Sequence, residues 1–214
     1  MITKKITADF ETYWHIGTGR GSGNHLDALV ETDAQGLPYV PGKTFKGLLR
    51  DAVFQAESLG WFADYPFNTD QKYLLTDLIF GQRALNSQEE QTRFDIQPGM
   101  IRVSNLNPED QAWLLSQEGE SLKPLVFREI YSTAIDTQTG TAKDKSLRGQ
   151  QVTIPMKLLG EIQFMPPLTQ DDFAIKQSEL LQNEDVIDYV LKVGISLVRS
   201  IGANKTRGFG RVTL

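Results

Sequence analysis

The residues best placed to do chemistry are basic side chains that stand beside glycines in acid-free stretches of the chain. Two such stretches are 43–50 and 199–214, neither of which contains Asp or Glu. A phosphate group needs positive charge and a backbone without bulky side chains in the way, so this composition predicts phosphate contacts. The residues that we expect to make them are Lys43, Lys46, Arg50, Lys205, Arg207 and Arg211.

A third acid-free stretch, 12–26, contains a glycine at every second position from 17 to 23. The backbone of such a loop can approach a ligand closely, and Arg20 lies inside it. We therefore add Arg20 to the predicted phosphate contacts. A mobile connector is the alternative.

A helix predicted to begin at Lys43 explains how the first basic stretch would be presented. Apolar residues recur at three- and four-residue steps from Phe45 to Leu59, so one face should be buried. The free N–H groups of its first turn favour an anion. Gly47 costs about 1 kcal/mol relative to Ala in a helix, and close approach of a sugar-phosphate chain is one reason to keep it. A solvated basic face is the alternative.

Charge and composition exclude several classes of protein. The net charge of -5 argues against a general nucleic-acid binder, but the acids concentrate in 86–120 and 161–188, away from the basic stretches. The absence of Cys excludes disulfides and thiolate zinc sites, and two His leave little for an imidazole-rich metal site. No run approaches the roughly 20 apolar residues of a membrane helix, and the N-terminus does not resemble a signal peptide. We expect a cytoplasmic protein without a membrane partner.

The triplet Gly42-Lys43-Thr44 also occurs in nucleotide-binding P-loops. That motif needs Gly five positions before Gly42, where this chain has Leu37. Pro41 would in addition remove an N–H group that such a loop uses. The sequence therefore argues against a nucleotide hydrolase.

The order of predicted elements indicates the fold class. A two-residue alternation predicts a strand over 6–16. The further predictions are a turn at 33–36, helices over 43–59, 72–80 and 186–201, a helix start at 107–110, and strands at 28–32, 99–104, 125–130, 152–154, 162–164 and 209–214. Strand, helix, strands, helix and strand are typical of an α+β, ferredoxin-like (RRM-like) core with insertions. We expect a single domain over residues 1–214.

One insertion, the polar and turn-rich stretch 134–148, is too long for a tight hairpin. Loops of this length in a compact domain are usually functional or disordered. We predict a protruding arm in which Lys143 and Lys145 contact phosphates and Ile135 and Leu147 provide apolar groups. A disordered surface loop is the alternative.

Four motifs stand in sequence: GLPYVPGKTFKGLLR at 36–50, LIFG at 78–81, IDTQTGTA at 135–142 and GANKTRGFGRV at 202–212. Together they resemble the RAMP superfamily of CRISPR-Cas proteins, most closely the backbone subunit of type III (Csm/Cmr-like) effector complexes. This resemblance implies an RRM-like core that polymerises along a CRISPR guide RNA, with the glycine-rich loops on the guide backbone. It also implies as partners a complementary target RNA and other Cas subunits, including copies of this chain, related RAMP subunits and a large subunit.

The same resemblance implies a catalytic residue and a role for the arm. In the family, a target-cleaving aspartate lies six residues before a second aspartate and upstream of the PYxPG turn, and Asp27 and Asp33 have that spacing. A carboxylate with a pKa near 4 is a weak base for a 2′-hydroxyl proton, so we expect Asp27 to position a divalent ion, such as Mg²⁺, or to orient the hydroxyl. We expect no dedicated protein cage for this ion. The implied arm displaces a base pair at regular intervals along the guide-target duplex.

Three functions stay open at this point. The first is an RNA-guided endoribonuclease subunit that uses Asp27. The second is a non-catalytic RNA-binding structural subunit. The third is a guide-processing nuclease that uses His15 and His25, which flank the glycine loop, although isolated histidines are more often packing or solvent residues.

Overall fold

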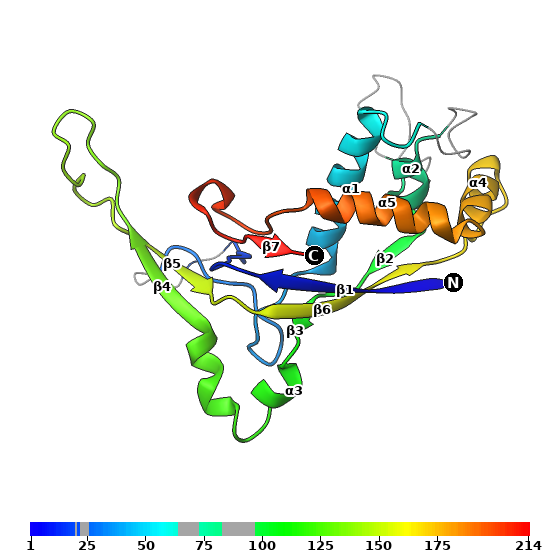
Figure 1. Cartoon of the computed structure of the whole chain (residues 1–214). Helices are drawn as coiled ribbons and strands as arrows, with labels where there is room; N and C mark the ends of the chain where they lie inside the picture. Colours follow the sequence, from blue (N-terminus) through cyan, green and yellow to red (C-terminus); the bar gives the residue numbers. More distant parts are fainter. Residues whose placement is uncertain (20, 22–25, 64–72, 83–96) are drawn as a thin grey trace. The chain divides into compact units, whose positions relative to one another are not determined.

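The computed structural model describes residues 1–19, 21, 26–63, 73–82 and 97–214 (Figure 1). Its strands are β1 (Ile2–Phe10), β2 (Ile101–Val103), β3 (Asn107–Pro108), β4 (Phe127–Ser132), β5 (Arg148–Thr153), β6 (Lys157–Phe164) and β7 (Val212–Thr213). Its α-helices are α1 (Gly42–Ser58), α2 (Leu75–Phe80), α3 (Gln111–Leu114), α4 (Asp172–Leu181) and α5 (Glu184–Leu197), and the 3₁₀ helices include η2 (Glu120–Val126) and η3 (Lys205–Arg207). None of the described helices is long and apolar enough to cross a membrane.

The larger sheet has the strand order β2-β6-β1-β7, and β3 also pairs with β6. The β1–β7, β2–β6 and β3–β6 pairs are antiparallel. Apart from the segment between β2 and β6, which holds β3, β4 and β5, the chain runs β1-α1-α2-β2-β6-α4-α5-β7. The first and third strands of this series are neighbours in the middle of the sheet, which is the ferredoxin-like arrangement. The predicted α+β fold class is confirmed.

The chain divides into two compact units, each built from three segments. Unit 1 comprises Met1–Ile6, Pro41–Asn105 and Gly160–Val198, and unit 2 comprises Thr7–Val40, Leu106–Leu159 and Arg199–Leu214. Strands β1 and β6 contribute residues to both. This division does not test the single domain expected over residues 1–214, which stays a prediction.

In unit 1, α1 buries the predicted apolar face and packs against α5. A Cβ added at Gly194 of α5 would lie 2.6 Å from Cγ2 of Val53 and 2.9 Å from Cδ1 of Leu49, so the two helices meet at this glycine. Leu59, predicted to be buried, is 70% exposed because the helix ends before it.

The last turn of α1 instead buries Glu57, which no local sequence pattern predicts. Its carboxylate accepts hydrogen bonds from the N–H groups of Leu75 (2.6 Å) and Thr76 (3.0 Å) and from the Thr76 hydroxyl (2.7 Å). These bonds satisfy free N–H groups at the start of α2, whose own N-cap provides no side-chain bond. The helix predicted over 72–80 therefore begins at Leu75.

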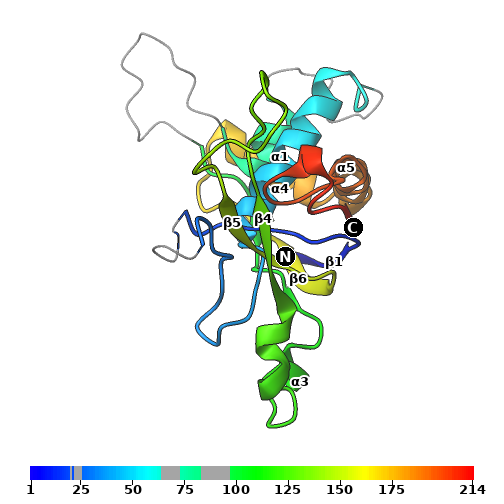
Figure 2. The same ribbon diagram turned by 90° about the vertical axis from the view of Figure 1, so that its left-hand side faces the viewer.

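In unit 2, the aromatic rings of Phe10 and Trp14 stack with centroids 4.6 Å apart, and the Trp14 indole N–H donates to the Ile154 carbonyl at 3.0 Å. A second apolar cluster contains Leu37, Leu114 and Val126. Strands β4 and β5 form a separate antiparallel hairpin, side by side in Figure 2. This hairpin carries the segment predicted to be an arm.

Several predicted boundaries were wrong for local reasons. The strand predicted over 6–16 ends at Phe10, and 28–32 forms isolated bridges rather than a strand. The predicted helix start at 107–110 is in part strand β3, which pairs with β6. Helix α5 ends at Leu197 because Val198 is extended, and β7 begins only at Val212 because Gly208 and Gly210 have positive φ.

Candidate nucleic-acid interface

The turn at 33–36 is built by Asp33. Its carbonyl accepts from Gly36 N–H at 3.0 Å, and its Oδ1 accepts from the N–H groups of Gln35 and Leu37, both at 2.9 Å. Gly36 has φ of +79°, a conformation that favours glycine. The predicted turn is confirmed, and the Asp33 carboxylate is occupied in holding it.

The first residue of helix α1 is Gly42, and no larger residue fits there. A Cβ on Gly42 would overlap the Val103 carbonyl oxygen and lie 2.7 Å from that of Ser104. The Gly42 N–H donates to Oδ1 of Asn105 at 3.0 Å. Asn105 therefore satisfies one N–H of the helix start, which has no acid in its first turn.

Lys43 and Gly47 lie one helical turn apart on the exposed side of α1. Outside its own stretch of helix, no atom of the described residues lies within 4 Å of the position that a Cβ on Gly47 would take, and this glycine is within the helix rather than at its end. The packing of the described protein gives no reason for a glycine here. The exposed face of Lys43 and Gly47 is therefore open to a ligand that approaches closely.

The structure places Lys46 and Arg50 differently from Lys43. The Lys46 ammonium donates to the Ile101 carbonyl at 2.9 Å, and burial, together with the charge of Arg50, lowers its pKa. Arg50 donates to the Gly81 carbonyl at 2.6 Å and lies 3.8 Å from the Asp77 carboxylate. Both side chains hold unit 1 together, so phosphate binding by either would compete with contacts inside the protein.

The C-terminal basic segment forms a loop, residues 202–211, fixed at both ends. The Ala203 N–H donates to the His15 carbonyl at 2.9 Å, and the Gly210 N–H donates to the Tyr13 carbonyl at 2.7 Å. A Cβ on Gly210 would overlap the Ile201 carbonyl oxygen, so this end requires glycine. The loop is thereby held on the segment that leads into the glycine-rich stretch.

The middle of this loop faces solvent. Lys205 and Arg207 are exposed on η3, and at Gly208, whose φ is +84°, an added Cβ would have no atom of the described chain beyond its two neighbours within 4 Å. Arg211 is also exposed, with its Nε 2.9 Å from the Glu11 carboxylate. An exposed pair of this kind is weak in water, so it leaves the guanidinium available.

Of the two histidines, His15 is buried, with 4% of its surface exposed. Its ring Nδ1 is 2.7 Å from the Gln151 carbonyl oxygen, which accepts from the Nδ1–H tautomer. Burial lowers the pKa of His15, and the Gln151 carbonyl opposes part of this effect. His25 and Arg20 lie outside the described residues, so the expected convergence of the two histidines stays a prediction.

Asp27 is exposed and lies beside the start of β5. Its N–H donates to the Gly149 carbonyl at 2.8 Å, and its Oδ2 accepts from the Gly149 N–H at 2.8 Å. The other carboxylate oxygen is not used in this exchange. The sequence did not indicate Gly149, because 122 residues separate the two partners.

The segment 133–147 extends beyond the paired residues of β4 and β5, as Figure 1 shows. Ile135 and Ala142 form a bridge, and the Ser146 hydroxyl lies 3.1 Å from the Ala134 nitrogen and 2.6 Å from the Lys143 carbonyl oxygen. Ile135 is 58% exposed and Leu147 is 69% exposed, and Lys143 and Lys145 are exposed as well. The predicted protruding arm is confirmed, and apolar and basic groups project from it.

Within the described residues, no group of three or more His, Asp or Glu side chains could hold a metal ion. Among the described residues, a divalent cation at Asp27 would therefore have fewer than three such side chains as ligands. Mg²⁺ commonly keeps several waters and binds through one or two carboxylates plus substrate phosphates, so a single exposed carboxylate fits such an ion only together with RNA.

No curated protein matched the sequence. The structure is similar to a chain in the cryo-EM structure of the Type III-B Cmr-beta bound to cognate target RNA, with a TM-score of 0.60 and 10% sequence identity. The match covers 100% of this chain and 96% of the other. At this identity the similarity establishes the fold. A family model described as RAMPs, the RAMP superfamily, matches residues 7–213, and the chain therefore belongs to the RAMP superfamily.

Proposed function

We propose that this chain is a guide-RNA-binding backbone subunit of a type III CRISPR effector complex, acting in the cytoplasm, that binds complementary target RNA and cleaves it. Family membership over residues 7–213 and the fold shared with a chain of a target-bound Cmr complex support this function. The remaining support comes from the chain's own residues.

The observation that carries the proposal is Gly47 beside Lys43. A glycine inside a helix costs about 1 kcal/mol relative to alanine. Among the described residues, no atom packs against Gly47 to offset this cost, whereas a sugar-phosphate backbone against the helix would need a residue without a side chain. Lys43, one turn away, then supplies the charge for a phosphate.

The loop 202–211 provides the second set of phosphate contacts. Lys205 and Arg207 are exposed beside Gly208, and Arg211 follows. Of the basic residues predicted to bind guide phosphates, we therefore assign the main contacts to Lys43, Lys205, Arg207 and Arg211. Lys46 and Arg50 contribute chiefly by holding the fold around α1.

For target cleavage we assign Asp27. Its backbone and one carboxylate oxygen are fixed by Gly149, so the other oxygen has a defined place at the base of the arm. There it would orient a 2′-hydroxyl of the target or hold one edge of a hydrated Mg²⁺ that stabilises the charge of the scissile phosphate. The arm, with Ile135 and Leu147 as wedges, would unstack the target next to Asp27.

A second candidate function is a non-catalytic RNA-binding subunit. The same two hydrogen bonds between Asp27 and Gly149 favour it, because a purely structural acid would make them too. Target binding without cleavage by the assembled complex selects this candidate over the first.

The experiment that tests the proposal measures guide-RNA binding by a variant with alanine at Lys43, Lys205, Arg207 and Arg211. Each lost phosphate contact should reduce the slope of log affinity against log salt by about 0.7, the value for single strands. The matched control carries alanine at four other lysines, Lys5, Lys157, Lys176 and Lys192, and so has the same net charge. Equal affinities and slopes for the two variants would contradict the assigned surface.

A further inference from the structure

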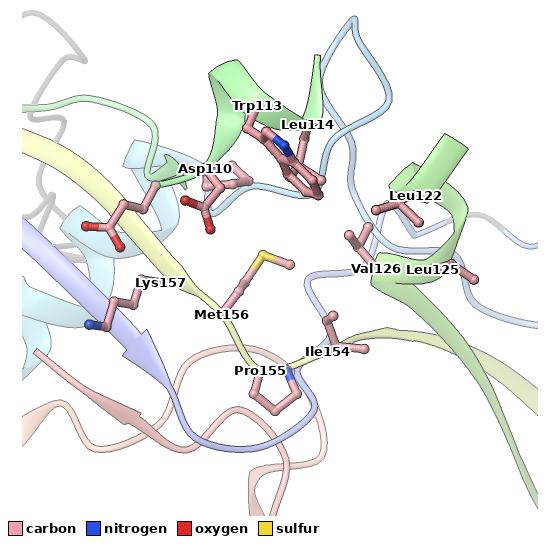
Figure 3. Close-up of a pocket in the computed structure, with 12 residues that line it drawn as sticks. Asp110, Trp113, Leu114, Leu122, Leu125, Val126, Ile154, Pro155, Met156 and Lys157 are labelled. Carbon is pink, nitrogen blue, oxygen red and sulfur yellow. The ribbon is translucent and has the colours of Figure 1, made fainter. Parts of the chain in front are cut away.

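Unit 2 contains an apolar groove of about 560 Å³ that the RNA-binding function leaves unexplained. Figure 3 shows Met156 between side chains of α3 and of η2. The floor of the groove belongs to the apolar cluster that contains Leu114 and Val126, which are nearly fully buried. The exposed apolar side chains of its walls are Trp113 (47% exposed), Leu122 (38%) and Leu125 (51%).

The charges around this groove disfavour nucleic acid. Glu109 and Asp110 line it, and both are exposed. Lys157 on another wall lies 3.9 Å from the Asp9 carboxylate, and Lys123 of η2 lies 2.7 Å from the Glu120 carboxylate. The four acids named here therefore outnumber these two cations. A phosphate chain would be repelled here, whereas a protein segment with Lys or Arg beside apolar residues would be attracted.

The backbone around the groove disfavours an added strand. The Ile154 N–H donates to the Val126 carbonyl, and the Ile154 carbonyl accepts from the Trp14 indole. The carbonyls of Met156 and Lys157 accept from the N–H groups of Phe10 and Glu109. The groove is also lined by α3 and η2, which are helical and offer no strand edge. An occupant that satisfies its own backbone, such as a helix, therefore fits this groove better than an added strand does.

We propose that this groove is the docking site for a basic amphipathic helix of another protein subunit. The apolar face of that helix fills the space between Trp113, Leu125 and Met156, and its Lys or Arg side chains reach Glu109 and Asp110. Aromatic residues at the centre of an apolar pocket commonly dominate such interfaces. This site goes beyond the proposed function and does not depend on RNA.

The first test uses the purified full chain and two synthetic 18-residue helical peptides with the same leucine pattern. One peptide carries lysines at all other positions and the other carries glutamates. The lysine peptide should bind about tenfold or more tightly than the glutamate peptide, and Leu125→Asp should weaken its binding by about tenfold or more. Since Leu125 is half exposed, this variant should keep the wild-type circular dichroism and melting temperature.

A charge control separates the groove from non-specific attraction to an acidic protein. The double substitution Glu109→Gln and Asp110→Asn should weaken binding of the lysine peptide severalfold. The pair Glu161→Gln and Asp185→Asn removes the same charge at exposed acids of unit 1 and should leave binding unchanged. Equal weakening by both pairs, or no effect of Leu125→Asp, overturns the proposed site.

The second test identifies the occupant in the assembled complex, with p-benzoylphenylalanine in place of Trp113 as a photocrosslinker. A crosslink to a helix of a different protein subunit, with apolar residues at three- and four-residue steps beside Lys or Arg, is the expected result. A crosslink to RNA, to a second copy of this chain or to nothing overturns the proposal. If no RNA-bound complex forms, the proposed function fails. The peptide test alone then still decides whether the groove binds a basic amphipathic helix.

Discussion

Asp27 and Gly149 hold each other by two hydrogen bonds: the Asp27 N–H donates to the Gly149 carbonyl, and the Gly149 N–H donates to the Asp27 carboxylate, both at 2.8 Å. Gly149 is the second residue of β5, the strand by which the chain returns from the arm. The candidate catalytic carboxylate is therefore fixed to the base of the arm. A substitution that removes its charge but keeps its hydrogen bond to Gly149 can distinguish a catalytic role from a structural one.

Asp27→Asn makes this separation. Asparagine keeps an oxygen that can accept from Gly149 N–H, so folding, assembly and target binding should match the wild type. Target-RNA cleavage should fall by about 10²-fold or more, because the charge that orients the hydroxyl or the ion is lost. Single-turnover cleavage rates test this, with Asp33→Asn as the control that should cleave normally. A wild-type rate for Asp27→Asn would remove Asp27 from catalysis.

Gly47→Ala should change stability and RNA binding in opposite directions. The free energy of unfolding should rise by about 1 kcal/mol, because alanine favours the helix and its methyl group meets no other part of the chain that the structure describes. Guide-RNA affinity should fall, because the new methyl group occupies the face of Lys43. Urea unfolding and RNA titration of the same sample measure the two effects.

Gly194→Ala is the contrasting variant for this experiment. Its methyl group would meet Val53 and Leu49 where α5 packs on α1, so it should lower the free energy of unfolding. If Gly47→Ala raises stability and leaves RNA affinity unchanged, the exposed face of α1 is not a phosphate site.

The arm should set the spacing of cleavage products. Replacing both Ile135 and Leu147 by serine should leave the melting temperature unchanged, because both side chains are more than half exposed. The regular interval between target cleavage sites should blur, since the wedges that unstack the target are lost. Sequencing gels of the products measure this interval, and replacing 137–146 by a Gly-Ser linker should have the larger effect. Unaltered spacing in both variants would show that the arm has no such role.

The sequence predicted the features that depend on neighbouring residues. The turn at Asp33, the helix after Pro41 and the arm all follow from local residue types, and the structure contains them. It could not predict features that need a distant partner. The bonds of Lys46 to Ile101 and of Arg50 to Gly81, and the Glu57 cap on α2, join residues 18 to 55 positions apart.

The apolar groove was missed for a related reason. Trp113 and Leu114 belong to a short apolar run that suggests scaffold, and only the structure shows that Leu114 is buried while Trp113 is half exposed. The partners of α3 in the groove come from η2 and from 154–157, which local periodicity does not connect. An exposed apolar wall therefore looks like ordinary core in the sequence.

Stability should depend on pH through His15. Burial lowers its folded pKa below the ordinary value near 6.5, so the unfolded chain binds a proton that the folded chain does not. The stabilisation is fully present above pH about 6.5 and is lost as pH falls from there toward the folded pKa. His15→Gln, which can still donate to Gln151, should show a smaller decrease in the free energy of unfolding between pH 7 and pH 5.5. Equal decreases in the two proteins would contradict a neutral, buried His15.

Guide-RNA binding by this RAMP protein, as proposed, means that the RNA should be purified together with it. Its most direct test is to purify the chain with the products of neighbouring genes and to sequence the RNA that comes with it. We predict short RNAs that each carry CRISPR repeat sequence next to a spacer, and their loss when Lys43, Lys205, Arg207 and Arg211 are replaced by alanine. Random cellular RNA, no RNA, or equal recovery from that variant would contradict guide-RNA binding by these residues.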